Sequence, residues 1–219
     1  MNERKIEHPI LFSTPMVQAI LEGKKIMTRR VIKNKFFLKY PKARFYEKSS
    51  DLLKDVEVRF HGKKVDPKTV TLFEDVSTGF MFGVKCPYGK VGDRLWVRES
   101  WCNISKAEVA PEYVFKADTL DAEDYDPTEW RWKPSIHMPK AAARIWLEIT
   151  GIRVERLWDI TEAEAKAEGA EFQLWRTLNN TDTTSYKNGF TSLWLHINGD
   201  DSWNANPWVW VVEFKRIEK

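Results

Sequence analysis

Short segments of β-branched, aliphatic and aromatic residues dominate the pattern of this 219-residue sequence. Each is bounded by Gly, Pro, Asn or Asp, which is typical of short strands rather than of long helices. Amphipathic segments between them predict helices, and the order does not alternate as in a βαβαβ chain. It therefore predicts an α+β fold built around a small, mostly antiparallel β-barrel with flanking helices. The predicted strands are residues 28–32, 94–98, 112–117, 143–150, 152–158 and 207–217, with a tight turn or bulge at Gly151, and the main predicted helices begin near residues 14, 161 and 191.

Two of the predicted helices have clear end signals. Pro15 suits the first turn of the N-terminal helix, and Gly23 ends that helix before the strand at 28–32. Thr161, with Glu164 three residues later, forms a capping box at the start of the second helix. Gly169 then ends this helix. These signals place the ends of two helices at Gly23 and Gly169.

Charge is distributed unevenly along the chain. Residues 33–64 carry ten Lys and Arg against four Asp and Glu, whereas residues 118–130 carry six acidic and no basic residues. The polar, weakly periodic region 33–83 predicts a peripheral insertion of loops with one hairpin at most. Its basic part can face phosphates, or it can be an ordinary solvated segment. The organisation predicted is a single domain over 1–219 with insertions at 33–83 and 118–140.

Several classes of protein are disfavoured by the sequence. No stretch approaches the roughly 20 apolar residues of a membrane-spanning helix, and Pro9 interrupts the short apolar run of an N-terminus that does not read as a signal peptide. The prediction is a cytoplasmic protein with no membrane partner. Cys86 and Cys102 lack the paired Cys and His spacing of a zinc site, so two reduced thiols are expected. No motif dictates a metal or a nucleotide cofactor, and we expect neither.

The segment from Gly23 to Arg30, GKKIMTRR, carries the most specific motif. It resembles the G-x-K-x-x-T-x-R signature of the ASCH-domain family, which belongs to the PUA-like β-barrel superfamily, and Lys25 and Thr28 fill the two central motif positions. Other parts of the chain are similar to phage and prophage members of that family. These are residues 96–99, 135–139 and 206–209. Residues 20–23, 92–93, 160–169 and 212–214 also resemble the family in general.

The resemblance implies a PUA-like barrel and a nucleoside or nucleic acid (RNA or DNA) as partner. One branch of the family removes the acetyl group from N(4)-acetylcytidine, and its proposed catalytic Lys, Thr and Glu match Lys25, Thr28 and Glu168 here. Amide hydrolysis needs a nucleophile, a base and a group that holds the oxyanion. Thr28 offers the hydroxyl, and Lys25 serves as base if burial lowers its pKa. Alternatively, Thr28 positions a water molecule and Lys25 stabilises the oxyanion.

Six further residues are candidates for substrate binding, and each also has an ordinary structural interpretation. An Arg on a strand is a clamp for phosphate or carboxylate, or a salt-bridge partner. A loop His can hydrogen-bond a base edge, although most such residues are structural. An Asn amide can read a base edge, yet Asn also dominates turns, and a Trp can stack on a base or fill the core. The candidates are Arg30, Arg98, Glu99, His137, Trp203 and Asn206.

Three functions remain open at this point. The first is a metal-independent amidohydrolase that acts on an acylated or otherwise modified pyrimidine nucleoside. The second is a module that binds RNA, DNA or a modified base without chemistry. The third is a nuclease for single-stranded RNA. The set of Lys25, Thr28 and Glu168 favours the enzyme, whereas the basic stretch favours the two hypotheses that involve a polymer.

Overall fold

The protein is described by a computed structural model that covers residues 5–39, 42–45, 58–60, 63–65, 71–103, 113–119, 131–176 and 182–218. Its internal contacts divide the chain into two compact units. The first unit combines Met1–Arg30 with Tyr88–Lys219, and the second is Val31–Pro87. Each unit is described by itself below.

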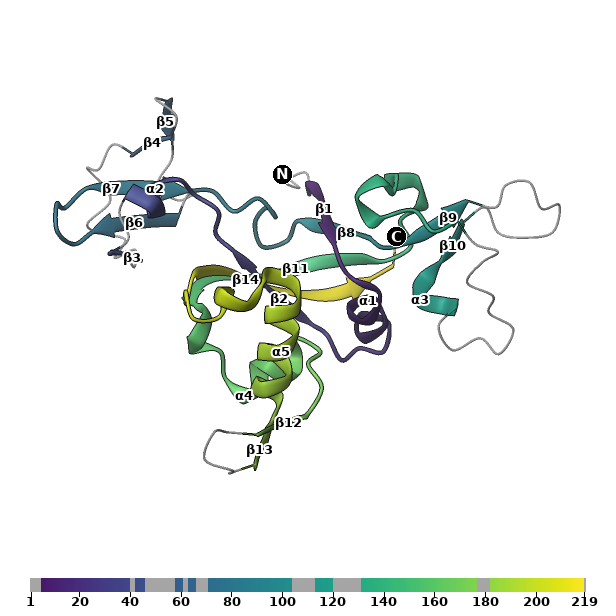
Figure 1. Ribbon diagram of the computed structural model, residues 1–219. Coiled ribbons are helices and arrows are strands. Elements are labelled where there is room, and N and C mark those ends of the chain that lie inside the picture. Colours follow the sequence, from purple (N-terminus) through teal and green to yellow (C-terminus); the bar gives the residue numbers. More distant parts are fainter. Residues whose placement is uncertain are drawn as a thin grey trace. The chain divides into compact units, whose positions relative to one another are not determined.

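The first unit is built on a five-stranded sheet in the order β1-β8-β11-β14-β2 (Figure 1). Strand β1 runs parallel to β8, whereas β11 is antiparallel to both β8 and β14. The sheet is therefore mixed, with an antiparallel centre. Its strands are β1 (Glu7–Leu11), β2 (Met27–Val31), β8 (Arg94–Arg98), β11 (Trp146–Arg156) and β14 (Trp208–Ile217).

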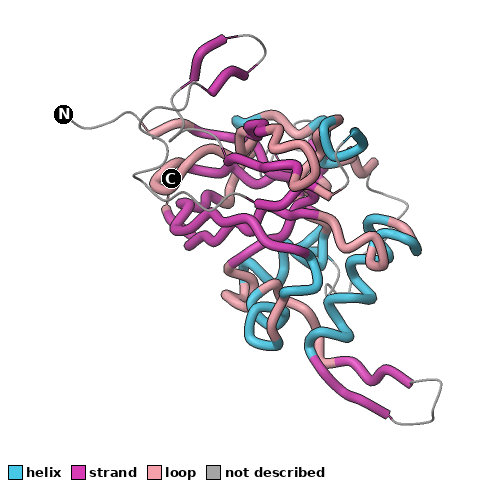
Figure 2. Tube along the Cα trace, turned by 90° about the vertical axis from the view of Figure 1, so that its left-hand side faces the viewer, coloured by secondary structure: helices cyan, strands magenta, loops and turns pink. Residues whose placement is uncertain are grey.

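Helices cover one side of this sheet (Figures 1 and 2). They are α1 (Thr14–Leu21), α4 (Glu162–Ala167) and α5 (Tyr186–Asn198). The side chains of successive strand residues alternate between the two faces, so Leu95 and Leu147 share the face opposite to Arg94 and Trp146. Leu95 and Leu147 are fully buried. The two short turns η2 (Ser135–His137) and η3 (Lys140–Ala142) lie on the other side.

The remaining elements of the first unit are short. Strand β9 (Trp101–Asn103) pairs with β10 (Tyr113–Phe115), which leads into α3 (Lys116–Thr119). Strands β12 (Gln173–Arg176) and β13 (Asp182–Ser185) form a hairpin that projects from the helical side. Single 3-10 turns, η4 (Leu157–Asp159) and η5 (Asp200–Ser202), complete the unit.

The second unit has its own aromatic core. Strands β3 (Ala43–Phe45), β6 (Thr71–Asp75) and β7 (Met81–Val84) form a three-stranded sheet, and β4 (Val58–Phe60) pairs with β5 (Lys63–Val65). Helix α2 (Phe36–Lys39) places Phe37 against Phe73 and Phe82, whose rings stack 5.6 Å apart. The prediction that this region consists of loops with one hairpin is therefore wrong. The aromatic residues of this core come from positions far apart in the sequence, which a local periodicity cannot reveal.

The α+β class is confirmed, and so are most of the predicted elements. Four details differ. The helix predicted from about residue 191 is α5, which begins at Tyr186. The predicted strands at 143–150 and 152–158 are one continuous strand, β11, with a register shift between Ile149 and Gly151 that matches the predicted bulge. The predicted strand at 112–117 is β10, which pairs with β9 outside the main sheet. The strands of the described residues form an open sheet rather than a closed barrel.

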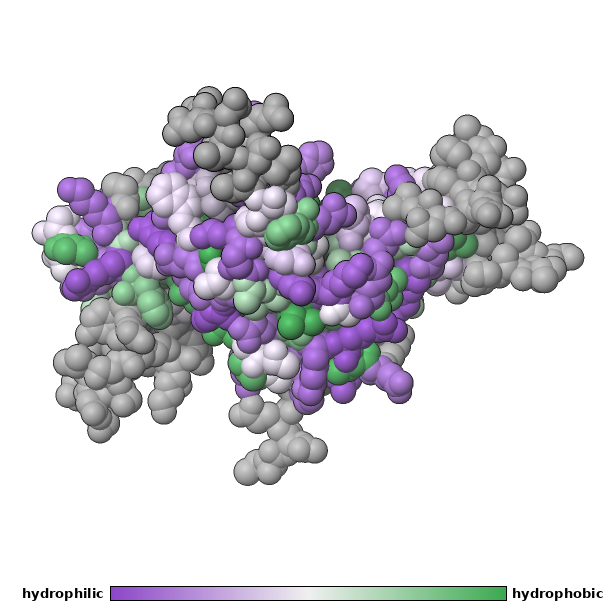
Figure 3. Space-filling model, turned by 90° about the horizontal axis from the view of Figure 1, so that it is seen from below, coloured by the Kyte–Doolittle hydropathy of each residue, from purple (hydrophilic) through white to green (hydrophobic). Residues whose placement is uncertain are grey.

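Other expectations can be placed on the structure. Both cysteines are free thiols, with Cys102 buried and Cys86 half-buried. Within the described ranges, no helix combines the length and apolar character that crossing a bilayer requires. Part of each predicted insertion, including residues 46–57 and 120–130, lies outside the described residues. In the central part of the face drawn in Figure 3, hydrophobic side chains form small separate patches among hydrophilic ones.

Candidate functional site: a buried lysine–glutamate pair

Lys25 lies in the turn that joins α1 to β2. Gly23 adopts a left-handed conformation (φ 72°) that ends the helix, and the Lys25 amide donates to the Ala19 carbonyl over 2.9 Å. The side chain is directed into the protein, where its Nζ donates to Glu168 Oε2 at 2.8 Å and to the Glu168 carbonyl at 2.7 Å. No part of the Lys25 side chain is exposed. The predicted pair of Lys25 and Glu168 is therefore in direct contact.

Glu168 reaches this position from the C-terminal end of α4. The predicted capping box of Thr161 and Glu164 starts the helix, and Glu168 is its C-cap residue. A backbone bridge joins Glu168 to Lys25, so main-chain and side-chain contacts hold the same two residues. Gly169 follows with a φ of 78°. The two helix ends that the sequence marks with glycine thus meet at the charged pair.

Arg29 is the functional candidate that sequence reasoning missed. Its guanidinium is completely buried and forms ion pairs with Glu155 (3.0 Å), Glu164 (3.1 Å) and Glu168 (3.5 Å). Arg153 contacts Glu155 and Glu164 from the other side. The Glu168 carboxylate therefore bridges two cations, with Oε2 on Lys25 and Oε1 on Arg29. The one sequence signal for Arg29 is the alternation of side chains along β2, which places Arg29 on the face opposite to Thr28 and Arg30.

Burial dominates the electrostatics of Lys25. It lowers the pKa of the amine from its ordinary value of 10.5, the charge of Glu168 opposes this shift, and the nearby Arg30 and Arg29 add to it. The Phe12 ring also contacts the amine, with its centroid 5.6 Å from Nζ. An amine with these surroundings releases its proton more readily than a surface lysine.

Thr28 and Arg30 lie on the opposite face of β2 from Arg29. Thr28 is 2% exposed, and among the described residues its hydroxyl has no hydrogen-bond partner. Arg30 donates to the Leu11 carbonyl at 2.6 Å, and its guanidinium lies 5.2 Å from the Phe12 centroid. Phe12 thus contacts both Arg30 and Lys25. The Lys25 amine itself is closed off from solvent in this structure.

Arg98 and Glu99 lie at the end of β8, and His137 lies in η2. Glu99 is fully buried and accepts two hydrogen bonds of 3.0 Å from Arg144, which also pairs with Asp118. Burial raises the pKa of Glu99, which Arg144 opposes. Arg98 donates to the Ile136 carbonyl and packs on Trp96. The side chain of His137 is exposed.

Trp203 and Asn206 form the turn before β14. The indole of Trp158 donates to the Trp203 carbonyl at 2.8 Å, and its backbone amide donates to Asn206 Oδ1 at 2.9 Å. The Asn206 carbonyl also accepts from Arg156, and Asn206 has a φ of 40°. Their recorded contacts are those of a structural turn, and none of them is to Lys25 or Glu168.

The described part of the chain contains no group of three or more His, Cys, Asp or Glu side chains that could hold a metal ion. The three glutamates nearest to this arrangement surround the Arg29 guanidinium instead. No family model, curated protein or solved structure matches the chain.

Gly169 is expected to be required for the close approach of α4 to Lys25. A Cβ atom at this position would lie 3.0 Å from the Ala19 Cβ and 3.1 Å from the Lys25 Cβ, in a backbone conformation that side chains disfavour. Gly169→Ala should lower the free energy of unfolding by about 2–3 kcal/mol, measured by urea denaturation. Gly23→Ala is the matched control, because it shares the positive φ but meets nothing within 4 Å. Equal losses for the two variants would contradict a packing role for Gly169.

Proposed function

We propose that this protein is a nucleoside- or nucleic-acid-directed member of the ASCH type, with a PUA-like architecture, and that it hydrolyses the amide bond of an acylated pyrimidine nucleoside without a metal. Lys25, Thr28 and Glu168 are its proposed catalytic residues. The observation that carries the proposal is the buried contact between Lys25 and Glu168 at two helix ends. The mixed sheet, in which α1 connects the edge strands β1 and β2, is compatible with this architecture.

A buried ion pair supports a functional interpretation because it contributes little to stability. Removing two charges from water costs several kcal/mol per ion, and apolar residues of similar volume often serve the fold as well. Perturbed titratable groups gather at functional sites, and the pKa of Lys25 is lowered chiefly by burial. An amine that is neutral nearer to physiological pH can accept a proton, which an ordinary surface lysine cannot do efficiently.

Each of the three proposed catalytic residues has a defined role in the reaction. The Thr28 hydroxyl, or a water molecule that it orients, attacks the acyl carbon while its proton passes to Lys25. Collapse of the tetrahedral intermediate breaks the bond between the acyl carbon and the exocyclic nitrogen, and the proton is returned to the leaving amine. If Thr28 was the nucleophile, water then hydrolyses the ester to release the acid. Glu168 orients the amine through Oε2, and Arg29 holds the other carboxylate oxygen.

The second candidate function, a binding module without chemistry, is favoured by a different observation. The Lys25 side chain is not exposed, and Glu168 already accepts two of its hydrogen bonds. Substrate therefore reaches the amine only if the segment around it opens. Binding of a modified base at the half-buried Arg30 does not require access to the Lys25 amine.

Turnover of N(4)-acetylcytidine by three variants tests the proposal. Lys25→Ala is expected to abolish hydrolysis, and Lys25→Arg should fail as well because arginine keeps its proton. Lys24→Ala is the matched control, since Lys24 is an adjacent exposed lysine whose ion pair within the described residues is with Glu22. Wild-type turnover should rise with pH through a midpoint below 10.5, because the base is the neutral amine and its pKa is lowered.

Three outcomes decide between the candidates. Full activity of Lys25→Arg would show that Lys25 acts only as a positive charge and would remove the base mechanism. Binding of acylated cytidine without hydrolysis by the wild type would favour the binding module. Neither binding nor hydrolysis would contradict the proposed substrate class.

A further inference from the structure

A pocket of about 340 Å³ opens on the side of the sheet that faces away from α1. Strands β1, β8 and β11 supply its floor and η3 supplies one wall. The described residues that line it are Glu7, Arg94, Lys140, Ala141 and Trp146. Alternation along β8 and β11 directs Arg94 and Trp146 to the face opposite to Leu95 and Leu147. The pocket is therefore separate from the Lys25 site, and a volume of this size suits a small ligand.

Arg94 is distinctive because its charge is not compensated. Two carboxylates are its direct cross-strand neighbours, Glu7 on β1 and Glu148 on β11. Lys140 pairs with Glu7, while Lys5 and Lys215 pair with Glu148 at 2.5 and 3.1 Å.

The consequence is a free guanidinium in the pocket wall. Among the described residues, the Arg94 side chain makes no hydrogen bond or ion pair, and its Nε atom is buried without a partner. The Nε atoms of Arg29, Arg30 and Arg98 are also unpartnered, but those three residues use their other nitrogens. Arginine presents a planar fork of donors that matches phosphate and carboxylate groups. With Glu7 and Lys140 neutralising each other, the pocket wall carries one uncompensated positive charge.

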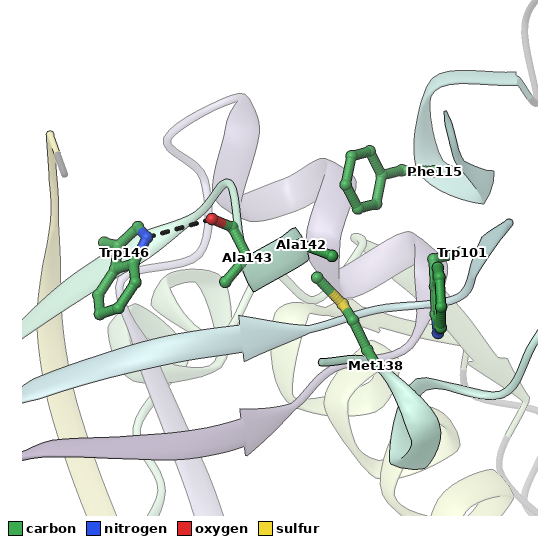
Figure 4. Close-up of a cluster of buried hydrophobic side chains, with 6 residues drawn as sticks. All are labelled: Trp101, Phe115, Met138, Ala142, Ala143 and Trp146. Atoms are coloured by element: carbon green, nitrogen blue, oxygen red, sulfur yellow. Dashed lines mark hydrogen bonds between the residues drawn. The ribbon is translucent and has the colours of Figure 1, made fainter. Parts of the chain in front are cut away.

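Trp146 and Ala141 form the apolar part of the pocket lining. Trp146 is 3% exposed, and its indole nitrogen donates to the Ala143 carbonyl at 3.3 Å (Figure 4). Figure 4 also shows Ala142 and Met138 in the same hydrophobic cluster. This cluster fixes the indole ring, and the Lys140 amine lies 5.7 Å from its centroid. Ala141 adds a second small apolar contact.

We infer that this pocket binds a small planar molecule that carries one oxyanion group, phosphate or carboxylate, with the oxyanion on Arg94 and the planar group against Trp146 and Ala141. The net charge of the wall matches a single negative charge. The inference does not rest on the amidohydrolase proposal, because none of the pocket residues contacts Lys25, Thr28 or Glu168 in the described structure.

Isothermal titration of the full chain with three pyrimidine probes tests this site. Uridine 5′-monophosphate and orotate carry a phosphate and a carboxylate respectively, whereas uridine carries neither. At least one anionic probe should bind more tightly than uridine, and the preferred anion identifies the source. Arg94→Gln should weaken that binding by about tenfold or more, since a hydrogen bond to a charged group is lost. Arg94→Lys, which keeps the charge but not the fork, should bind with intermediate affinity.

Two variants serve as controls. Arg216→Gln removes the same charge from an exposed position on β14 outside the pocket and should bind like the wild type. Lys24→Gln removes the charge of an exposed lysine outside the pocket and should also keep full affinity. Equal binding of uridine and the anions, no binding of either anion, or equal affinities of Arg94→Gln and Arg216→Gln would overturn the inference. If Arg94→Gln does not fold, wild-type affinity of Arg94→Lys would overturn the proposed fork contact.

Discussion

Replacing Glu168 by alanine is expected to lower the free energy of unfolding by about 3–5 kcal/mol, because removal of one partner leaves an uncompensated charge in the interior. Lys25 is completely buried and has two acceptors, and both belong to Glu168. The variant keeps the backbone carbonyl but loses the carboxylate. Arg29 loses one of its three carboxylate partners as well. Urea denaturation followed by circular dichroism measures the loss.

The pH dependence of this loss has a defined sign. In the variant, Lys25 lacks its counter-charge. The pKa of its amine therefore falls further below the value of 10.5 in the unfolded chain. The unfolded state then binds more protons than the native state between the two pKa values, so stability rises with pH in that window. The deficit of Glu168→Ala should therefore shrink as the pH is raised. A deficit that grows with pH would contradict the assignment of the buried charge to Lys25.

A double variant provides the matched comparison. Lys25→Met combined with Glu168→Leu removes both charges and keeps the approximate volume, so it should recover most of the stability lost by Glu168→Ala. The exposed pair of Lys24 and Glu22 serves as control, and removing Glu22 should produce no measurable change. A double variant as unstable as Glu168→Ala would show that packing, rather than charge, explains the loss.

The contact between Lys25 and Glu168 could be predicted because local signals marked both ends of it. Gly23 and Gly169 end their helices where the sequence places them, and Thr161 caps α4 as predicted. Local sequence chemistry determines such ends. The similarity to a family motif then linked two residues that are 143 positions apart. Periodicity alone offers no basis for that link.

The partners of Arg29 and the freedom of Arg94 could not be predicted in the same way. Each depends on which strands are neighbours and in what register, and a slip of one residue would move either side chain to the other face. Arg94 has two carboxylates opposite it, yet lysines that are distant in sequence take both. Asn206 was selected from the sequence as a binding residue, and in the structure its Oδ1 accepts from the Trp158 amide in the turn before β14.

Replacing Arg29 by methionine is expected to cost about 3–5 kcal/mol of unfolding free energy, the range observed when one member of a buried ion pair is removed. The side chain is completely buried and contacts three carboxylates. Without the guanidinium, Glu155 and Glu164 keep only Arg153, which is one-third exposed and is shared with Glu213. The like charges of the glutamates then repel one another, although Glu155 and Glu164 remain about one-fifth exposed.

The pH dependence of the Arg29→Met deficit runs opposite to that of Glu168→Ala. Burial raises the pKa of Glu164, but the hydrogen bond from Thr161 and the charges of Arg29 and Arg153 outweigh this effect and hold the pKa below its ordinary value of 4.5. Loss of Arg29 therefore removes stabilisation that exists only while this carboxylate is ionised. The deficit should therefore shrink as the pH is lowered and the carboxylates become protonated. Arg30→Met is the control, because Arg30 is half-buried and, among the described residues, donates to a backbone carbonyl rather than to a carboxylate. This variant should lose about 1 kcal/mol of unfolding free energy, and the loss should depend little on pH. Arg29 is interpreted as the cation that holds the glutamates together and orients Glu168 toward Lys25. Two outcomes would contradict this role: equal losses of unfolding free energy for the two arginine variants, or a deficit of Arg29→Met that shrinks with rising pH.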